Sequence, residues 1–494
     1  MESIEHIKRR IMRNLEQTRT EGAEYADARF YTDDSSETLV LYDGNLEAND
    51  TGVQQGIGIR VLMGGAWGFS ATSDLKKIDE CFENARQNAR TASKLVRVPL
   101  TMGKSSPHKD TYRAPVKRDP FTVPLDEKLD FLKGVDSVLQ DEWILRRYVY
   151  ANIQRRNILF WNTDGSEIEK SLTNIFGTME VMALDEDGDM QRRSMDLYST
   201  GTGTRGWEMF VDPELFSGHA ERIKEELSQL LKAESLEYGR RSVIILPGQG
   251  FLQVHETIGH PLELDRILGY ELSYAGGSFV TLDDVGTLRY GSDKLNVSAF
   301  GSIENSPGTF GYDDDGSPER DYLLIDKGIL KDVLSSRAMI HEANEKAGRE
   351  VFSEIGGVAR ATAFYRAPID RMTNVNIVPG NDGNLEDIIA TTEDGIVVDN
   401  PTSWSIGSNR EHFHFGCQIA WEVKNGKRTR VLRNPTYQGH TLEFYSSLDA
   451  VGDESTWRVE QVPNCGKGEP NQIMQLGHGI PVIRFANVIT GERE

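Results

Sequence analysis

Two histidines and a glutamate lie within one short segment, His255-Glu256-Thr257-Ile258-Gly259-His260. Each neutral imidazole offers one nitrogen lone pair to a metal ion, and the adjacent carboxylate can take a proton from metal-bound water. These residue types, so close together, predict a zinc site. On spacing alone, the alternative is a helix terminus whose histidines are solvated or hydrogen-bonded.

The spacing of His255 and His260 requires an irregular backbone if both rings are to bind one ion. Histidines at i and i+4 are about 40° apart around a helix axis, whereas at i and i+5 they are roughly 140° apart, so a straight helix would splay the two rings. Gly259 can relax the backbone, and Pro261 disfavours α geometry at His260 and removes a helical donor. We therefore predict a kink or a π-bulge that brings both rings to one ion.

Two residues are candidates for the third metal ligand. Glu263 follows His260 by three positions, and Cys465 lies in the irregular segment PNCGKG, where the nearby Lys467 would favour the thiolate. The other two cysteines are predicted to be core residues. Cys81 lies on the apolar face of a predicted helix, and Cys417 alternates in step with two phenylalanines along a predicted strand.

Four further histidines have simpler interpretations than metal binding. His412 and His414 share one face of a predicted strand, which favours a surface or cleft-lining strand. His440 and His478 lie in Gly-containing stretches, where turn structure is at least as well favoured as a place in a cleft.

Two short patterns resemble ligand-binding loops only in part. Residues 201–206 match G-x-G-x-x-G, but the βαβ context of a nucleotide site is missing, so we predict a flexible strand connection. Residues 313–316 resemble part of a calcium loop without its full spacing or its bidentate glutamate, so we predict a turn.

Composition narrows the partners and the setting. Lys and Arg total 55 and Asp and Glu total 77, a formal net charge of −22, which argues against nucleic acid or an anionic membrane surface as the main partner. No window of about 20 apolar residues is present, so no membrane span is predicted. Three cysteines make no disulfide framework and the N-terminal segment lacks an apolar signal region, so we expect a reducing, cytoplasmic setting.

The elements that must position the candidate site follow from periodicity and turn signals. Strands are expected at 25–30 and 37–42, helices at 74–96, 125–140 and 213–237, and a buried strand from Ser242 that leads into the histidine segment. Asp43-Gly44 and Asn425-Gly426 are typical of tight hairpin turns.

These elements predict an α+β fold with three parts. We expect a mixed α/β N-terminal domain over 1–105, a central α/β domain over 116–238, and a larger, β-rich antiparallel C-terminal domain over 239–494 that carries the zinc site. A Pro-rich stretch between Pro99 and Pro124 indicates the connection between the first two.

Several longer motifs are spread over nearly the whole chain. They include GAEYADARF and GIGIRVLMGGAWGFSAT near the N-terminus, VHETIGHPLELDR in the middle, and PNCGKGEPNQIMQLGHGIPVIRFANV near the C-terminus. Over about 22–487 the chain resembles the TldD/PmbA family of zinc metallopeptidases. The joint occurrence of HExxxH and the distant CGKG resembles the TldD-like catalytic type, because PmbA-like paralogues lack these ligands.

The resemblance implies roles for individual residues. His255, His260 and Cys465 match the zinc ligands of the family. Glu256 matches the general base that activates a zinc-bound water. Glu263 matches an acidic position in the family's segment, where we expect a supporting role.

The resemblance also implies an activity and partners. It implies a zinc-dependent peptidase that hydrolyses peptide bonds of unfolded or extended peptides, and a dimer of either two such chains or one chain with a PmbA-like paralogue. Two alternatives stay open: a non-catalytic partner subunit, and a zinc amidohydrolase of small molecules. The physiological substrate, the cleavage preference and the choice between endo- and exopeptidase action do not follow from the residues.

Overall fold

The computed structural model describes residues 3–195 and 206–492. The glycine-rich pattern at 201–206 therefore lies, except for Gly206, outside the described residues. Helices and strands are mixed along the chain, which confirms the predicted α+β class. Among the helices of the described residues, none is long and apolar enough to cross a membrane.

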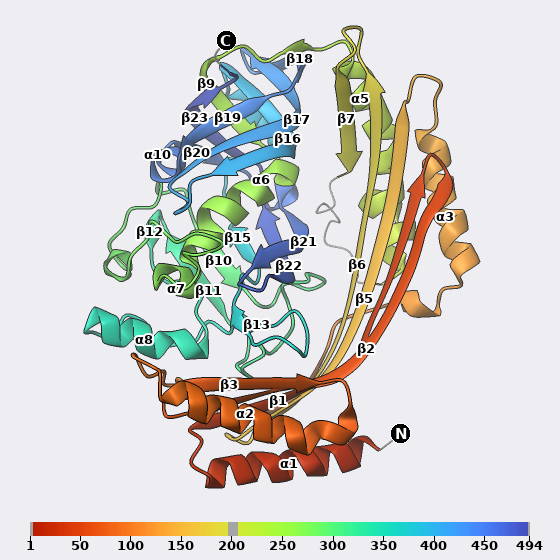
Figure 1. The fold of residues 1–494 in the computed structure, drawn as a ribbon. Helices are drawn as coiled ribbons and strands as arrows, with labels where there is room; N and C mark the ends of the chain where they lie inside the picture. The colour runs from red at the N-terminus through yellow and green to blue at the C-terminus, as the bar shows by residue number, and fades with distance from the viewer. Residues whose placement is uncertain (1–2, 196–205, 493–494) are drawn as a thin grey trace.

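A seven-stranded sheet with the order β3-β2-β1-β5-β6-β4, and β7 paired to β6, forms one wall of the molecule (Figure 1). Its strands are β1 Tyr25–Tyr42, β2 Asn45–Met63, β3 Ala66–Thr72, β4 Lys109–Arg113, β5 Arg146–Asn162, β6 Glu167–Leu184 and β7 Met190–Met195. The strands predicted at 25–30 and 37–42 are parts of the single strand β1, which ends at the predicted Asp43-Gly44 turn. Both turn residues have positive φ, 48° and 78°, as a tight hairpin requires.

The two predicted N-terminal parts both contribute to this sheet, because β1 pairs antiparallel with β5. Each end of the sheet has its own core and its own pair of helices (Figure 1). At one end α1 Ile4–Thr20 and α2 Ile78–Ser93 bury Ile11, Phe82 and Cys81 against the strands, which confirms Cys81 as a core residue. The domain boundaries themselves stay predictions.

At the other end, α3 Leu125–Leu139 and α5 His219–Leu230 cover the strands, and the short α4 Glu208–Val211 precedes α5. The helix predicted over 213–237 is therefore wrong in its extent. Residues Pro213–Ser217 form a separate π-helical turn that ends at Gly218. Helix α5 ends at Leu230, and the residues after it form the short strand β8 Glu234–Ser235, which pairs with β18 of the C-terminal body.

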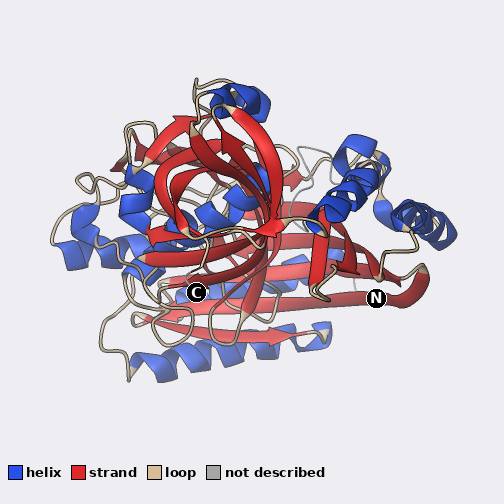
Figure 2. Ribbon diagram, turned by 90° about the horizontal axis from the view of Figure 1, so that it is seen from above, coloured by secondary structure: helices blue, strands red, loops and turns tan. Residues whose placement is uncertain are grey.

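The C-terminal body is built on an eight-stranded sheet. Its strands besides β8 are β9 Gly239–Ile245, β16 Asp394–Ile406, β17 His412–Lys424, β18 Lys427–Arg433, β19 Thr436–His440, β20 Leu448–Val451 and β23 Ile483–Thr490. Because β16 pairs with both β9 and β17, the path β16-β9-β23-β19-β17 closes into a ring, which Figure 2 shows from above. Most pairs are antiparallel as predicted, but β16 runs parallel to β9, as β18 does to β8.

Smaller elements complete this body. The strands are β10 Val297–Phe300, β11 Asp321–Asp326, β12 Ile329–Leu330, β13 Ala359–Arg360, β14 Ile369–Asp370, β15 Val375–Ile377, β21 Arg458–Lys467 and β22 Gln472–Ile480; the helices are α7 Leu264–Ile267, α8 Arg337–Ala347, α9 Leu385–Ala390 and α10 Thr441–Ser446. The hairpin of β17 and β18 turns at the predicted Asn425-Gly426.

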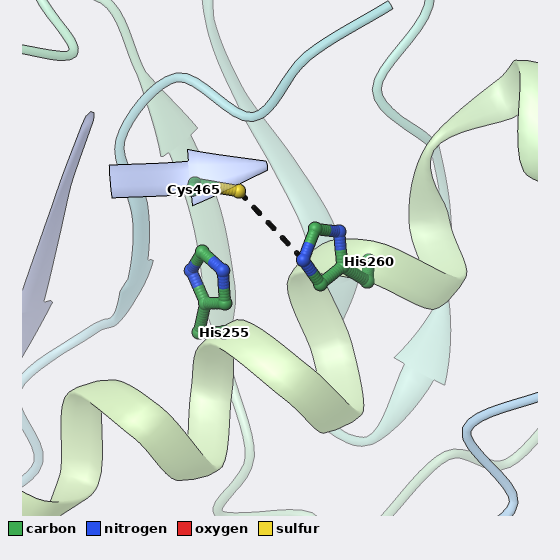
Figure 3. Close-up of side chains that lie close together, drawn as sticks. All are labelled: His255, His260 and Cys465. Atoms are coloured by element: carbon green, nitrogen blue, oxygen red, sulfur yellow. Dashed lines mark hydrogen bonds between the residues drawn. The ribbon is translucent and has the colours of Figure 1, made fainter. Parts of the chain in front are cut away.

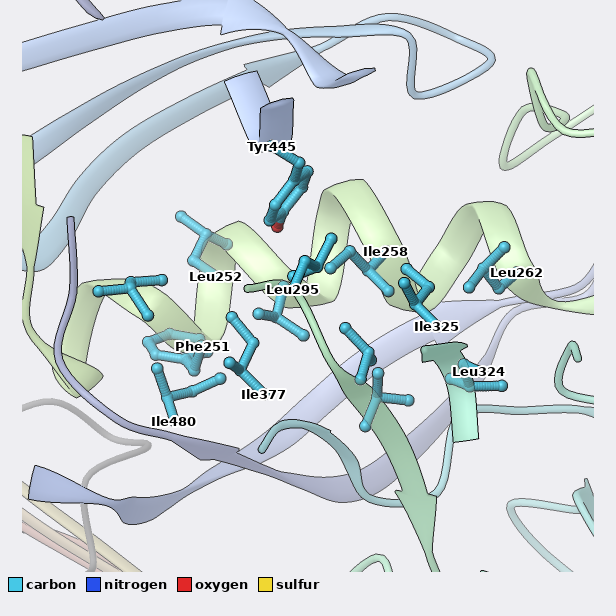
Figure 4. Close-up of a cluster of buried hydrophobic side chains, with 14 of the residues drawn as sticks. Phe251, Leu252, Ile258, Leu262, Leu295, Leu324, Ile325, Ile377, Tyr445 and Ile480 are labelled. Carbon is cyan, nitrogen blue, oxygen red and sulfur yellow. The ribbon is translucent and has the colours of Figure 1, made fainter. Parts of the chain in front are cut away.

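Helix α6 Pro247–Val254 lies in the largest hydrophobic core (Figure 4). All of its residues are buried, and its sequence PGQGFLQV contains no charged side chain, as expected of a helix surrounded by protein. Phe251 and Leu252 belong to the same cluster as Ile377 and Ile480, as does Cys417, which confirms Cys417 as a core residue. This packing fixes the helix from which the histidine segment begins.

Candidate metal centre

The backbone changes its helical type at the histidine segment. Helix α6 continues into a π-helical turn over His255–Gly259 and then a 3-10 turn over His260–Leu262. The π-turn adds a residue to the turn between the two histidines, so their rings face each other with centroids 4.6 Å apart and planes at 80° (Figure 3). The predicted π-bulge is confirmed.

Gly259 allows this bulge to pack against its neighbours. A Cβ atom at this position would lie 2.1 Å from Sδ of Met372, far inside van der Waals contact. Pro261 is placed in the first 3-10 turn, where its missing N–H costs no regular helical bond. Gly259 therefore has the local role that the spacing argument required. His260 keeps α-helical dihedral angles, φ −61° and ψ −46°, so the expected effect of Pro261 on its backbone is not seen.

Cys465 approaches the two histidines from β21. Its Sγ lies 3.7 Å from Nε2 of His260, and the possible ligand atoms of His255, His260 and Cys465 all lie within 4.8 Å of one another. Tetrahedral zinc with ordinary Zn–S and Zn–N bonds separates sulfur and nitrogen ligands by about 3.6 Å. Within the described ranges, this is the one group of three or more His, Cys, Asp or Glu side chains that could hold a metal ion.

Glu263 supports His260 from the side away from Cys465. Nδ1 of His260 donates to Oε2 of Glu263 at 2.9 Å, which leaves the lone pair of Nε2 facing the sulfur. Burial would raise the pKa of Glu263. Its neighbours outweigh burial, with Lys467 contributing most, and hold the pKa well below its ordinary 4.5. The carboxylate is thus an acceptor that orients the ring, as expected of a supporting residue.

His478 supports His255 in the same way. Its Nδ1 donates to the backbone carbonyl of Val375 at 2.7 Å, so its Nε2 accepts the hydrogen bond from Nδ1 of His255 at 2.9 Å. The Nε2 lone pair of His255 is then the one left for a metal ion. His478 lies on β22, not in a turn, and the sequence argument gave it no role beyond a possible cleft position.

Burial keeps both histidines neutral. His255 and His260 are 5% and 4% exposed, and burial lowers the pKa of each to about 4. Because a neutral imidazole is the form that binds a metal, these rings need not lose a proton at neutral pH.

Arg371 is the cation that favours the thiolate of Cys465. Burial would raise the pKa of the thiol, but the charge of Arg371, followed by His260, lowers it below its ordinary 9.0. Nη2 of Arg371 also donates to the carbonyl of Cys465 at 2.6 Å. The prediction that Lys467 has this role is not supported, because its Nζ lies 2.6 Å from Oδ1 of Asp265 and neutralises carboxylates instead.

Glu256 lies beside the histidines with its carboxylate held by Arg410. Nη1 of Arg410 donates to Oε2 of Glu256 at 2.8 Å, and the glutamate is 8% exposed. The two residues are 154 positions apart in sequence, so no local pattern could have revealed the contact.

The remaining candidates lie elsewhere. His412 is exposed and His414 part-buried on β17, as the surface-strand interpretation predicted. His440 is exposed at the end of β19, on a strand and not in a turn, with its ring centroid 6.0 Å from that of His412. Residues 313–316 form the predicted turn, in which Oδ1 of Asp313 accepts hydrogen bonds from the backbone of Asp315 and Ser317.

The fold and the site together define an α+β protein with a buried His-His-Cys centre beside a carboxylate. The PmbA/TldA metallopeptidase C-terminal domain matches residues 239–491, and domain 1 of the same family matches residues 26–89. The chain belongs to the PmbA/TldA metallopeptidase family, which confirms the resemblance seen in its motifs.

Similar proteins come from archaea and bacteria. A metalloprotease of Methanocaldococcus jannaschii is 29% identical over 96% of this chain and 99% of its own length. A zinc metalloprotease TldD homologue of Saccharolobus solfataricus is 23% identical over 95% of this chain and 97% of its own length.

Solved structures share the fold. A Thermotoga maritima protein described as a modulator of a DNA gyrase has a TM-score of 0.74 at 18% identity, over 99% of this chain and all of that chain. TldE from Thermococcus kodakarensis has a TM-score of 0.70 at 16% identity, over 98% of this chain and all of that chain. These likenesses concern the fold alone.

Proposed function

We propose that this chain is a zinc-dependent peptidase whose metal ligands are His255, His260 and Cys465. The observation that carries the proposal is the convergence of the possible ligand atoms of His255, His260 and Cys465, all within 4.8 Å of one another, with Glu256 following His255 in the chain. The names of the relatives as metalloproteases, one of them a zinc metalloprotease, support it.

The donor set suits zinc. Two neutral imidazoles and a thiolate are nitrogen and sulfur donors of the kind that zinc prefers over calcium or magnesium, and three protein ligands leave a fourth position for water or substrate. Zinc bound there would supply a Lewis acid that polarises a peptide carbonyl and makes water more acidic.

Glu256 is the proposed general base. Its carboxylate would accept a proton from the attacking water and then deliver that proton to the leaving amine. Glu263 and His478 would hold the two imidazoles in the tautomers that present Nε2, through the hydrogen bonds described above. Arg371 would favour the thiolate form of Cys465.

Unfolded or extended peptides are the proposed substrates. The family resemblance supports this substrate class, and a cavity of about 250 Å³ lies between β5, β6 and the hairpin of β21 and β22 that carries Cys465. Its lining includes Arg156, Arg360 and Gln475, together with Pro463, two residues before Cys465.

Partners and location follow from the family. We propose a dimer, of two such chains or with a PmbA-like paralogue, and the fold shared with a protein named TldE supports such a paralogue. A cytoplasmic location is proposed from the three free, buried cysteines.

One experiment tests metal and chemistry together. The purified chain is analysed for zinc and incubated with a denatured protein, with and without a chelator, beside Glu256→Gln and Cys465→Ser. We expect Glu256→Gln to keep its zinc and lose about 10²–10⁴-fold in turnover per zinc, because the amide cannot accept the proton. Cys465→Ser should lose most of its zinc, since a hydroxyl is a poor ligand beside a thiolate.

Cys417→Ser is the matched control, because this cysteine is also buried in the same core but lies away from the site. It should lower stability and leave zinc per folded chain unchanged. Zinc bound by a wild-type chain that cleaves no peptide would favour the non-catalytic subunit. Near-normal turnover per zinc in Glu256→Gln would contradict the mechanism.

A further inference from the structure

Arg410 brings a buried cation to the carboxylate of Glu256. It lies in the turn between β16 and β17, with its side chain 14% exposed. Nη1 donates to Glu256 at 2.8 Å, and Nη2 donates to the backbone carbonyl of Ala275 at 3.0 Å. The guanidinium is therefore fixed at two points, one of them the proposed general base.

The backbone at this position is unusual for an arginine. Gly407 accepts a hydrogen bond from the N–H of Arg410 at 2.8 Å, which closes a tight turn, and Arg410 then adopts a φ of 70°. Glycine or asparagine usually occupies such a left-handed position after a turn, because other side chains are strained there. The arginine side chain thus has a role that turn formation does not explain.

Neighbouring segments hold the turn in place. Oγ1 of Thr441 donates to the carbonyl of Arg410 at 2.6 Å, and the N–H of Phe279 donates to the carbonyl of Asn409 at 2.9 Å. A Cβ atom on Gly276 would lie 2.1 Å from the carbonyl oxygen of Ser408, so the turn packs directly on the backbone of the preceding loop.

The same loop joins Arg410 to the support of His260. The carbonyl of Ala275 accepts from Nη2 of Arg410 and also from Nη1 of Arg266, and Nε of Arg266 donates to Glu263 at 2.7 Å. Glu263 in turn accepts from His260. One hydrogen-bond network therefore ties the general base and a metal-binding ring to one backbone carbonyl.

We propose that Arg410 is a positioning residue for the peptidase reaction, which holds Oε2 of Glu256 so that Oε1 faces the attacking water. This inference rests on the proposed function. Arg410 contacts Glu256 directly but reaches His260 only through Ala275, Arg266 and Glu263, so its loss should misplace the base while the metal stays bound. A misplacement of about 1 Å in such a group can cost about 10²-fold in rate.

Arg410→Gly is the test variant, because glycine fits the left-handed backbone and removes only the guanidinium. We expect kcat and kcat/KM on a denatured protein to fall together by about 10–100-fold, with zinc content unchanged and Tm at or near the wild-type value. Guanidinium ions at millimolar concentration should restore part of kcat. A crystal structure of the zinc-loaded variant should show the Glu256 carboxylate turned away or in several rotamers.

Two further variants sharpen the result. Arg410→Lys keeps a charge but not the two-point contact, so its activity should lie between those of the wild type and Arg410→Gly. Ser408→Gly loosens the same turn without removing the guanidinium and should stay within about twofold of the wild type.

Three outcomes would overturn the inference: Arg410→Gly with at least half of the wild-type kcat, a variant whose loss of activity matches a loss of zinc, or a Glu256 carboxylate unmoved in the variant crystal. A wild-type chain with bound zinc and no hydrolysis would instead remove the proposed function. In that case, the Glu256 rotamer in crystals of the wild type and of Arg410→Gly still decides whether Arg410 positions the carboxylate.

Discussion

His478 and His255 form a pair of buried, neutral imidazoles. His478 is fully buried, and burial holds its pKa well below the ordinary 6.5. Its hydrogen bond to Val375 decides which of its nitrogens carries the proton, and this choice passes to His255. The tautomer of His255, a proposed metal ligand, is thus determined by a backbone carbonyl on β15, a dependence that only the folded chain creates.

Removing this support should weaken metal binding without removing a ligand. In His478→Ala, Nδ1 of His255 loses its acceptor and the ring can turn away. We expect zinc affinity to fall about 10–100-fold, the usual effect of losing the hydrogen-bond partner of a metal-bound histidine. Competition with a chromophoric chelator measures this directly.

His440→Ala is the control for that measurement, because His440 is an exposed histidine at the end of β19 whose ring lies next to that of the exposed His412. Its zinc affinity should equal that of the wild type. Equal affinities in both variants would mean that His478 does not orient His255.

At the scale of elements, the π-helical turn depends on close packing between Gly259 and Met372. Gly259→Ala would press its methyl group into the Met372 thioether, 2.1 Å away before any shift. Overpacking of a core costs typically about 1–3 kcal/mol. Because Met372 also donates its N–H to Oε1 of Glu263 at 3.2 Å, movement there would disturb the support of His260.

We therefore predict that Gly259→Ala lowers both the free energy of unfolding, by about 1–3 kcal/mol, and the zinc content. Met372→Ala removes the obstructing side chain, so the double variant should recover zinc relative to Gly259→Ala. Denaturant unfolding and metal analysis of the single and double variants give the coupling. Strictly additive effects of the two substitutions on stability and zinc content would show that Gly259 is not required by its contact with Met372.

Local signals account for much of the fold and for part of the site. The turns at Asp43-Gly44 and Asn425-Gly426 and the irregular helix at Gly259 follow from the conformations open to a few adjacent residues. The prediction of one helix over 213–237 failed, because apolar periodicity does not show where a π-turn replaces an α-turn. Nor does it show where pairing with a distant strand ends a helix, as pairing with β18 does here.

The supporting residues of the centre could not be predicted in this way. Arg371, Arg410 and His478 reach the site through contacts between segments about a hundred or more positions apart. Nothing in their neighbours in sequence distinguishes them from ordinary structural residues. The family resemblance included the stretch around His478 but predicted no contact for this histidine.

At the scale of the whole molecule, buried ion pairs join the N-terminal sheet to the C-terminal body. Nζ of Lys170 on β6 lies 2.7 Å from Oδ1 of Asp314, and Nη2 of Arg60 on β2 lies 2.6 Å from Oδ1 of Asp315. These aspartates belong to the turn that resembles part of a calcium loop. Their charges are paired with cations of the sheet, and the neighbouring Asp313 accepts backbone hydrogen bonds within the turn.

The pair of Asp314 and Lys170 should be a large term in the stability of the assembled body. Burial would raise the pKa of Asp314, but Lys170 and then Arg29 outweigh burial and hold the pKa at about 2, below its ordinary 3.8. A carboxyl whose pKa is lower in the folded chain stabilises it above pH 3.8, and that stabilisation is lost as the pH falls from 3.8 towards 2. Between about pH 5 and pH 8 the term should therefore be constant.

Asp314→Asn should leave Lys170, which is 3% exposed as a residue, as a buried charge without its carboxylate partner. Breaking such a pair costs about 3–5 kcal/mol, because the remaining charge stays desolvated. Asp394→Asn is the matched control, since its pair with Lys424 has the same 2.7 Å separation but both side chains are about half exposed, at 53% and 44%. An exposed pair contributes about 0–1 kcal/mol.

Denaturant unfolding of both variants at about pH 5 and about pH 8 should give a large, pH-independent loss for Asp314→Asn and almost none for Asp394→Asn. Equal losses in the two variants, or a loss that grows steadily with pH over this range, would mean that the buried pair does not hold the sheet to the body in the way its geometry indicates.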